Sequence, residues 1–487
     1  MGITILDCYT DEPAGLGVPP YLGVYPRYLA GKFMADGEDV KYITIDDLRF
    51  LRNYDLDDGK KEVGRKTNIK IYNLTKNIGK IREILDGTTK LIVVLGVHTP
   101  GKYLSGVPGT LKEVILLIDG INCEKVLTGP AVFGTQLEGG KFAEKVDLSA
   151  FSEVFEFNYK YDEIKDSATR GASIVKQMNG LQMIEIETSH GCQRGKCSFC
   201  TEPLKFKLEF RAQRDIIDEM KEFYKLGSRY FRLGKQSCFY SYPKAEELLR
   251  EVRKVCKDIK VLHIDNVNPV NVLGRRGEEI TKAVVKYCTS GNVAAFGAES
   301  FDPVVAKEND LNCKAEDAFS AVKILNKFGG SRGEDGMPKF LPGINLLFGL
   351  KGESKKTHEA NYSWLKKVLD SGLLLRRINI RQVSIFEGTP MFDGVGNKFL
   401  RKNKKYYWKW RNEIRQKIDV AMMKRLLPTG SVLKKVRAEI YDGNTTFCRQ
   451  MGTYPLITGV KGRLELGKFY DLEVVGHMLR SVTGKVV

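Results

Sequence analysis

Residues 187–203 read ETSHGCQRGKCSFCTEP and hold three cysteines, Cys192, Cys197 and Cys200, in the spacing C-x4-C-x2-C. A closed tetrahedral metal site needs four protein ligands, and no fourth cysteine or histidine follows at a matching distance. His190 lies only two residues before Cys192, which is an awkward approach for a fourth ligand. The stretch therefore indicates a metal site with one coordination position left to an outside molecule.

Three interpretations of this trio are open: structural zinc, an iron–sulfur cluster, and thiols that bind no metal. Structural zinc would lack its fourth ligand here. A [4Fe–4S] cluster is ordinarily held by four cysteine thiolates, so three thiolates would leave one iron open for a small molecule. We favour the open cluster, with Cys192, Cys197 and Cys200 as its ligands.

The sequence around the trio alternates between strand and helix patterns. The predicted strands are MIEIETS, YFRLGK, KVLHID, NVAAFGAES, GINLLFGL and INIRQVSIF. Amphipathic helical stretches separate them, which predicts a central partial (β/α)6 barrel over residues 180–394. Barrels of this kind carry their chemistry on the loops that follow the strands. The trio directly follows the first strand, where this rule places a site.

The segment before the barrel has a similar alternation. Apolar strands between amphipathic helices predict a doubly wound parallel sheet over residues 1–165, so the fold class is α/β. Ligands of such sheets bind beyond the carboxyl ends of the strands. The candidate loops are rich in Gly and Pro and comprise residues 10–23, 96–106 and 128–134. The alternative is that these loops are only tight turns.

The C-terminal segment differs from both. Residues 431–487 alternate apolar with polar positions and are punctuated by Gly, which predicts a small β-barrel of about five short strands. Residues 395–430 form a basic connector to it.

The overall composition is that of an ordinary soluble globular protein, with 487 residues, 42% of them hydrophobic and 28% charged. No run of eighteen apolar residues occurs and the N-terminus lacks a leader pattern, so we expect a cytoplasmic protein without a membrane partner. Its ten cysteines are too scattered for a disulfide framework. The formal net charge of +18 predicts a polyanionic partner, nucleic acid before membrane.

The connector combines the two residue types that bind RNA. Residues 398–417 contain nine Lys and Arg and one acid, Glu413, with Tyr406, Tyr407, Trp408 and Trp410 among them. Phosphate neutralisation and base stacking need such cations and aromatics side by side. The alternative is an amphipathic helix whose aromatic residues pack on the barrel. The predicted RNA-binding residues are Lys404, Lys405, Tyr406, Trp408, Lys409, Trp410, Arg411 and Arg449.

The cysteine loop after the first strand, Phe199 before the last cysteine, and the six-unit barrel together resemble the radical S-adenosylmethionine (SAM) enzymes. That family usually has C-x3-C-x2-C, so the first gap here is one residue longer. RLGKQ (232–236) stands at the family's Gly-Gly-Glu turn, with Lys235 and Gln236 in place of the usual pair. FGAESFD (296–302), PGINLLFGLKGES (342–354) and IRQVSIFEGTPMF (380–392) resemble the family's fourth, fifth and sixth strands.

This resemblance implies a [4Fe–4S] cluster whose open iron chelates the amino and carboxylate groups of SAM. One electron from a donor protein would cleave the C5′–S bond to give a 5′-deoxyadenosyl radical, which abstracts hydrogen. The resemblance also implies that Gly234 lets the backbone approach the SAM amino group and that Ile344 and Leu346 pack around adenine. The full set of implied SAM-binding residues is Phe199, Gly234, Lys235, Gln236, Glu299, Ser300, Ile344 and Leu346.

The flanking domains carry two further resemblances. The N-terminal sheet is similar to the cobalamin-binding domain found before many radical SAM barrels, which implies His98, Gly129 and Pro130 as candidate cobalamin contacts. The D-x-H-x-x-G signature of histidine-ligated cobalamin is absent, and a sheet that holds no corrin is the alternative. The C-terminal segment resembles a TRAM domain, a small RNA-binding β-barrel.

These resemblances together imply a radical SAM enzyme that methylates a nucleotide of RNA, in tRNA, with the help of cobalamin. A methylthiotransferase is a rival interpretation, although that group has three N-terminal cysteines and only Cys8 and Cys123 occur here before residue 190. The sequence is also compatible with a radical modification of RNA without cobalamin and with a radical SAM enzyme acting on a protein side chain. A non-catalytic RNA-binding protein with a structural metal is compatible with it as well.

Overall fold

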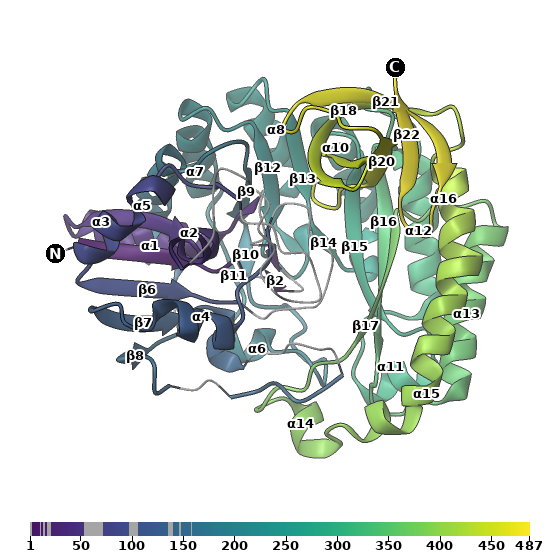
Figure 1. Ribbon diagram of the computed structural model, residues 1–487. Coiled ribbons are helices and arrows are strands. Elements are labelled where there is room, and N and C mark those ends of the chain that lie inside the picture. Colours follow the sequence, from purple (N-terminus) through teal and green to yellow (C-terminus); the bar gives the residue numbers. More distant parts are fainter. Residues whose placement is uncertain are drawn as a thin grey trace. The chain divides into compact units, whose positions relative to one another are not determined.

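A computed structural model of the chain describes residues 2–9, 11–12, 15–16, 21–52, 72–96, 106–134, 140–145, 148–156 and 158–487 (Figure 1). The chain divides into two compact units. Unit 1 consists of Met1–Gly139, Ala143–Glu187 and Glu209–Arg229, and unit 2 of Gly140–Phe142, Thr188–Leu208 and Tyr230–Val487. No helix in the described part of the chain combines the length and the apolarity that crossing a bilayer requires.

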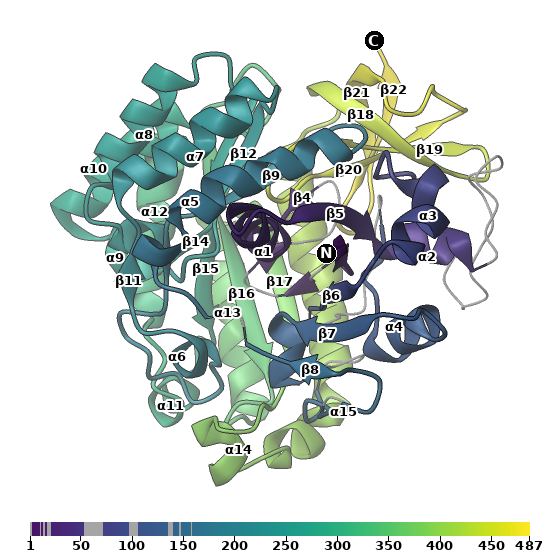
Figure 2. The same cartoon turned by 90° about the vertical axis from the view of Figure 1, so that its left-hand side faces the viewer.

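Unit 1 is built on a five-stranded sheet in which every neighbouring pair is parallel (Figure 2). Its order is β5 (Asp39–Thr44), β1 (Gly2–Asp7), β6 (Lys90–Val94), β7 (Glu124–Thr128) and β8 (Glu153–Val154). The connecting helices include α1 (Val24–Ala35), α2 (Ile45–Leu51), α3 (Ile81–Asp86) and α4 (Leu111–Ile118). This flavodoxin-like order confirms the predicted doubly wound sheet and places its switch point between β1 and β6.

Helix α1 packs closely on α5 (Tyr161–Gly171) through two glycines. A Cβ atom at Gly31 would overlap the carbonyl oxygen of Ser167, and one at Gly171 would overlap that of Arg27. The two helix backbones therefore touch, which only glycine permits. The short strand β4 (Tyr21–Leu22) precedes α1 and pairs in parallel with β9 (Met183–Glu187), the first of the predicted barrel strands.

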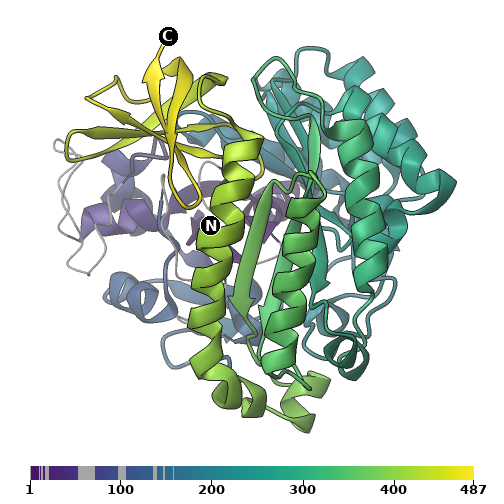
Figure 3. The ribbon, with the colours of Figure 1, turned by 90° about the vertical axis from the view of Figure 1, so that its right-hand side faces the viewer.

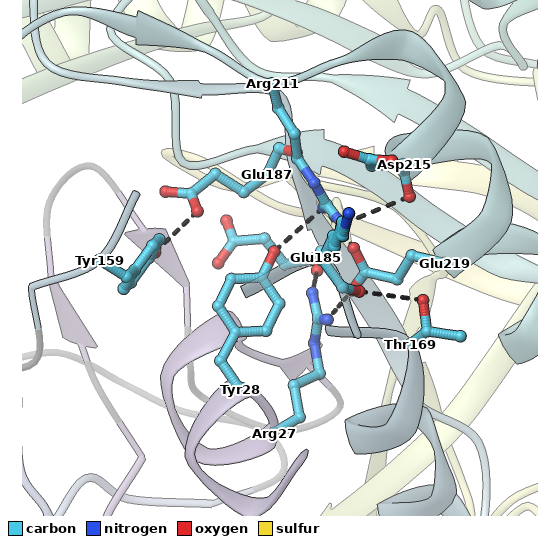
Figure 4. Close-up of polar contacts among 10 residues, drawn as sticks. Arg27, Tyr28, Tyr159, Thr169, Glu185, Glu187, Arg211, Asp215 and Glu219 are labelled. Atoms are coloured by element: carbon cyan, nitrogen blue, oxygen red, sulfur yellow. Dashed lines mark hydrogen bonds and ion pairs between the residues drawn. The ribbon is translucent and has the colours of Figure 1, made fainter. Parts of the chain in front are cut away.

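A buried cluster of charges joins α1, β9 and α7 (Gln213–Lys225) within unit 1 (Figure 4). Arg27 of α1 donates to Glu219 of α7 and to the carbonyl oxygen of Glu185 on β9. Arg211 donates to the same Glu219 and, over 3.1 Å, to the hydroxyl of Tyr28. Because desolvated charges are costly unless they are paired and hydrogen-bonded, these contacts fix the three elements to one another.

Unit 2 contains the other five predicted barrel strands, with the short β14 (Asn266–Val267) between two of them. They are β12 (Tyr230–Gly234), β13 (Val261–Ile264), β15 (Asn292–Glu299), β16 (Phe340–Phe348) and β17 (Arg377–Gln382). β12 pairs in parallel with β13, and β14, β15, β16 and β17 form a second parallel sheet in that order. All six predicted strands form, which confirms the partial barrel pattern.

Helices cover one face of the strands in unit 2. The connections run through α8 (Ala245–Val255), α10 (Gly274–Tyr287), α12 (Ala315–Gly329) and α13 (Lys355–Asp370). After β17 comes the long helix α15 (Lys398–Glu413), which continues through a π-helical turn (Ile414–Asp419) into α16 (Val420–Leu426). Figure 3 shows α13 and α15 lying side by side over the green strands. The predicted connector is therefore a helical layer of the barrel.

The C-terminal segment forms a closed five-stranded barrel, as predicted. Its strands are β18 (Val432–Asp442), β19 (Thr445–Gln450), β20 (Ile457–Lys461), β21 (Phe469–His477) and β22 (Val482–Val486). Its apolar core, with Leu433 and Leu472, is continuous with Met423 and Leu426 of α16 and Leu341 of β16. This shared core explains why the small barrel belongs to unit 2. Its likeness to a TRAM domain stays a prediction.

Candidate active site

The three predicted metal ligands lie on one loop between β10 (Ser189–His190) and α6 (Glu202–Lys205), and each is partly exposed. Burial raises the pKa of the Cys197 thiol to about 11, with further contributions from the charges of Glu299 and Cys192. Burial likewise raises the pKa of Cys200 to about 12, and ionisation of Cys197 and Cys192 would raise it further. The three thiols therefore lie close enough for the charge of one to act on another.

The cysteine loop is held in place by its own backbone and by a neighbouring segment. The amide of Cys200 donates to the carbonyl oxygen of Cys197 over 3.1 Å, which closes a tight turn. Gly195 has a φ of +58°, a left-handed conformation that glycine adopts without strain and that accommodates the extra residue of the first gap. The Ser198 hydroxyl lies 2.7 Å from Oδ1 of Asn309 and donates to it. These contacts position the thiols independently of any metal.

The donor set fits an iron–sulfur cluster, because such clusters take cysteine thiolates as ligands. Across the described residues, no three His, Cys, Asp or Glu side chains converge on a single-ion site. The nearby His190 stacks its ring on Phe206 at 4.4 Å between centroids and 14° between planes. The three thiols lie on one partly exposed loop, and their role as the ligands of a cluster with one open iron stays a prediction.

The turn after β12 adjoins the cysteine loop, as predicted. The Ser237 hydroxyl donates to the carbonyl oxygen of Gly191 over 2.9 Å. Gln236 is buried, and its amide donates to the carbonyl of Leu233 while its Oε1 accepts from the Thr188 hydroxyl. Lys235 has a φ of +65°, which is rare for a residue other than glycine. Gln236 therefore braces the turn, and Gly234 ends the strand directly before it.

The predicted residues after β15 differ in what they offer. Glu299 has a φ of +59° and follows a register shift in the pairing with β16, which turns its side chain toward Gly297. Burial raises the pKa of Glu299 to about 8, and the charge of Arg381 only partly offsets this. Ser300 is buried, and its hydroxyl accepts from the amide of Asp302. Glu299 is the group that faces the cysteine loop, whereas Ser300 caps the following turn.

The two apolar residues predicted to pack around adenine lie on the wrong face of β16. Ile344 and Leu346 are fully buried, whereas the alternating Asn345 and Leu347 are partly exposed. Phe348, on the side of Ile344 and Leu346, stacks on His358 of α13 at 5.1 Å, so that side is covered by helices. The prediction was one residue out of phase, because side chains of a strand alternate between its faces.

The other side of β15, β16 and β17, which the helices do not cover, is partly exposed, and we call it the inner face. The sequence analysis did not identify the side chains on this face, apart from Glu299. The rows of the inner face follow from the strand register, in which Gly343, Asn345 and Leu347 lie opposite Arg377, Asn379 and Arg381. Gly297 of β15 lies opposite Asn345 and is exposed, although β15 is an internal strand. Leu347 packs against the same apolar cluster as Cys197 and Phe199. The inner face consists of Gly297, Glu299, Asn345, Leu347, Arg377, Asn379 and Arg381.

The predicted cobalamin contacts lie partly outside the described residues. His98 falls there, with half of the loop 10–23 and most of the loop 96–106. Gly129 and Pro130 directly follow β7, and Gly129 has a φ of +99°. A Cβ atom at Gly129 would lie 2.6 Å from the carbonyl oxygen of Leu95, which directly follows β6. Two strand ends therefore touch at the carboxyl edge of the sheet, where ligands of this fold bind. Cobalamin contacts at this edge stay a prediction.

The predicted RNA-binding residues of α15 divide between two sides of the helix. Tyr407 is buried against Phe348, and the ring of Trp410 stacks on His358 at 5.9 Å and 11°. The exposed side carries Lys404, Lys405, Trp408 and Lys409, while Tyr406 and Arg411 are partly exposed. The guanidinium of Arg411 lies 5.2 Å from the Trp408 ring. Helix α15 therefore packs on the barrel with one side and presents a basic, aromatic surface with the other.

Arg449 does not belong to that surface, which corrects the prediction. Its side chain is buried in the small barrel, and its Nε donates to Glu439 over 3.0 Å. A buried guanidinium paired with a carboxylate has its charge already neutralised.

Known proteins resemble this chain both in its central segment and over nearly its full length. Residues 186–365 match the Radical SAM superfamily. An uncharacterized protein of Methanocaldococcus jannaschii is 42% identical, with 99% of this chain and 93% of that protein covered. An uncharacterized protein of Archaeoglobus fulgidus is 37% identical over 99% of this chain and 89% of its own length. The radical S-adenosylmethionine methyltransferase TsrM from Kitasatospora setae, solved with cobalamin and a [4Fe–4S] cluster bound, shares the fold. Its TM-score is 0.50 at 14% identity, over 80% of this chain and 73% of TsrM.

Proposed function

The chain belongs to the radical SAM superfamily, and from this premise we propose that it is a cobalamin-assisted methyltransferase that modifies a nucleotide of RNA. The observation that carries the proposal is the loop on which Cys192, Cys197 and Cys200 lie close enough for their charges to act on one another, with Glu299 close enough for its charge to act on Cys197. A cluster bound there would supply the electron for reductive cleavage of SAM.

The chain's own residues would position SAM. The thiolates of the cysteine loop would hold the cluster and leave one iron open. Glu299, held by the register shift of β15, can accept hydrogen bonds from the polar end of SAM. Leu347 offers an apolar surface on the inner face, beside the cluster that also packs Phe199. Together these groups orient SAM and exclude water from one side of it.

Cobalamin is supported by the strand order of unit 1. A flavodoxin-like sheet binds its ligand at the carboxyl edge beside the switch point, and at this edge Gly129 lets the end of β7 lie against the Leu95 carbonyl oxygen at the end of β6. The fold is shared with TsrM, a methyltransferase that has been solved with cobalamin. A corrin held at this edge would carry the methyl group, which suits transfer to an unactivated carbon.

RNA is supported by charge and by the exposed side of α15. The net charge of +18 favours a polyanionic partner. Lys404, Lys405 and Lys409 flank Trp408, whose side chain is 54% exposed, so a base can stack on the ring while phosphates meet the lysines. A transfer RNA would present both groups, and an electron donor protein would be the second partner.

The cluster assignment is tested by anaerobic reconstitution of the full chain. The wild type should bind about four irons and cleave SAM when reduced. A Cys197→Ala variant should lose both properties, whereas Cys256→Ala, which removes a buried thiol at the end of α8, should keep them. SAM cleavage by Cys197→Ala at the wild-type rate would contradict the assignment.

The substrate and the corrin need two further measurements. Protein produced with cobalamin supplied should carry a stoichiometric corrin absorbance; iron absorbance alone would remove cobalamin from the proposal. Mass spectrometry of nucleosides from cells that lack the gene should show one methylated nucleoside missing. An unchanged nucleoside profile together with intact SAM cleavage would exclude RNA and keep the radical SAM activity.

A further inference from the structure

The inner face carries arginine side chains that form no ion pair within the described part of the chain. Arg377 and Arg381 occupy the first and last rows of β17 on this face. Arg480, on the turn between β21 and β22, adds a third cation whose charge reaches Arg376 and whose own pKa responds to Arg377. In the described part of the chain, none of Arg377, Arg381 and Arg480 forms an ion pair or a hydrogen bond.

These arginines lie within electrostatic range of one another. Burial, together with the charges of Arg377 and Arg480, lowers the pKa of Arg376 to about 10. The pKa of Arg480 is also lowered to about 10, by burial and by its cationic neighbours. Three carboxylates act on these arginines. Asp419 acts on Arg480 and is already paired with Arg415, and Asp265 acts on Arg377 and is already paired with Arg232. Glu299 faces Arg381 without forming an ion pair, and burial raises its pKa to about 8. Because arginine stays protonated and desolvated charges are normally paired, the site is short of an anion.

Arg377 is held ready for such an anion. Its guanidinium lies 4.1 Å from the ring centre of Tyr454, and its Nε has no partner in the described part of the chain. Tyr454 is fixed in turn, because its hydroxyl donates to Asp265 over 2.6 Å and Asp265 pairs with Arg232. The ring fixes the plane of the guanidinium and leaves its N–H groups free. A planar fork of this kind matches two oxygens of a phosphate.

The row between the arginines presents amides. Asn345 and Asn379 lie directly opposite each other, and neither side-chain amide hydrogen-bonds to a described residue. Gly297 completes the row and leaves it open to solvent. Two unsatisfied amides offer donors and acceptors together, which suits the polar edge of a nucleobase. An anion site and an amide pair thus share one face, adjacent to the row of Glu299.

We infer that the inner face, together with Arg480, is the substrate site and that it takes a phosphate-bearing nucleotide. The phosphate lies among Arg377, Arg381 and Arg480, and the Asn345–Asn379 pair contacts the base. The nucleotide comes from an RNA chain or from a free nucleotide, since both offer the same phosphate. Only the RNA source rests on the proposed function.

The test measures binding by the full chain without SAM, so it does not depend on activity. Calorimetry with inorganic pyrophosphate and with AMP should show binding by the wild type. Arg377→Met should weaken it about 10-fold, and Arg480→Ala about threefold, since hydrogen bonds to charged groups are the strong ones. Arg275→Ala is the matched control. Arg275 has a side chain that is 92% exposed, and this substitution removes one positive charge at a position outside the inner face. Because Arg377 packs on Tyr454, Arg480→Ala provides a second variant that leaves this packing intact.

A single-stranded RNA of about a dozen nucleotides separates the two sources. If RNA is the source, pyrophosphate competes with it, and Arg377→Met and Arg480→Ala each lower the slope of log K against log salt by roughly 0.7. If the arginine variants affect AMP but not RNA, the site takes a free nucleotide, and the RNA part of the proposed function fails while this inference stands. No binding of pyrophosphate and AMP by the wild type, or arginine variants that bind them as Arg275→Ala does, overturns the inference.

Discussion

Arg27 of α1 and Glu219 of α7, which are 192 residues apart in the sequence, form an ion pair with no exposed side-chain surface. Glu219 pairs with both Arg27 and Arg211, so Arg27→Met leaves this buried carboxylate with one cation instead of two and should lower the free energy of unfolding by about 3 kcal/mol. Urea denaturation measures this. Arg214→Ala on the same helix is the control, since Arg214 is 90% exposed and pairs loosely with Asp218. Equal midpoints for the two variants would contradict the structural role of the pair.

His263 should make unit 2 sensitive to acid. Burial lowers its pKa from 6.5 to about 4, and its Nδ1 accepts from the amide of Thr453, which protonation would prevent. The unfolded state therefore binds more protons between pH 4 and 6.5. Stability from this group is present above pH 6.5 and is lost as the pH falls through that window, on the order of 3 kcal/mol in total. Plots of the free energy of unfolding against pH should diverge between the wild type and His263→Gln in this window. Identical slopes would show that His263 is not the group that makes the protein sensitive to acid.

The two faces of β16 can be separated with a pair of neighbouring leucines. Leu346 is fully buried on the helix-covered side, so Leu346→Ala should cost about 2–5 kcal/mol of stability. Leu347 is partly exposed on the inner face, so Leu347→Ala should cost less stability and weaken SAM binding by about 1–2 kcal/mol. Denaturation and SAM titration of the reconstituted protein measure both. The reverse pattern would place adenine on the other side of the strand.

Gly129 should tolerate no side chain. Its φ of +99° lies in a region essentially reserved for glycine, and a Cβ atom would stand 2.6 Å from the Leu95 carbonyl oxygen. Gly129→Ala should therefore cost on the order of 3 kcal/mol and reduce corrin retention. Gly37 also has a positive φ, of +85°, but has open space around it, so Gly37→Ala should cost only about 1 kcal/mol. Similar melting temperatures for the two variants would show that the backbone at Gly129 and Leu95 can move apart at little cost in stability.

Trp408 and Tyr407 are adjacent in the sequence but face opposite ways on α15. Trp408→Ala removes an exposed ring and should weaken RNA binding by about 1–3 kcal/mol with little change in stability. Tyr407→Ala removes a ring buried against Phe348 and should lower stability by about 3 kcal/mol. Filter binding and thermal unfolding distinguish the two. RNA affinity that is unchanged by Trp408→Ala would remove α15 from the interface.

Much of the architecture could be predicted because it is local. The six barrel strands, the parallel sheet of unit 1 and the five short strands at the end all follow from the spacing of apolar residues and the positions of glycine. The prediction failed where the phase of one strand mattered. Ile344 and Leu346 were chosen for their apolar character, and that same character placed them under the helices. Arg449 was chosen for its charge, which Glu439 neutralises.

By itself, the sequence determined the identity of the elements and the three-thiol loop, since each depends on residues that are near one another along the chain. Only the tertiary structure decided which side chains meet. The register of β16 and β17 sets Asn345 against Asn379, and packing of distant segments brings Arg480 into the electrostatic reach of Arg377. Periodicity is a property of neighbouring residues, whereas such meetings depend on how whole elements pair and pack, which no local pattern records.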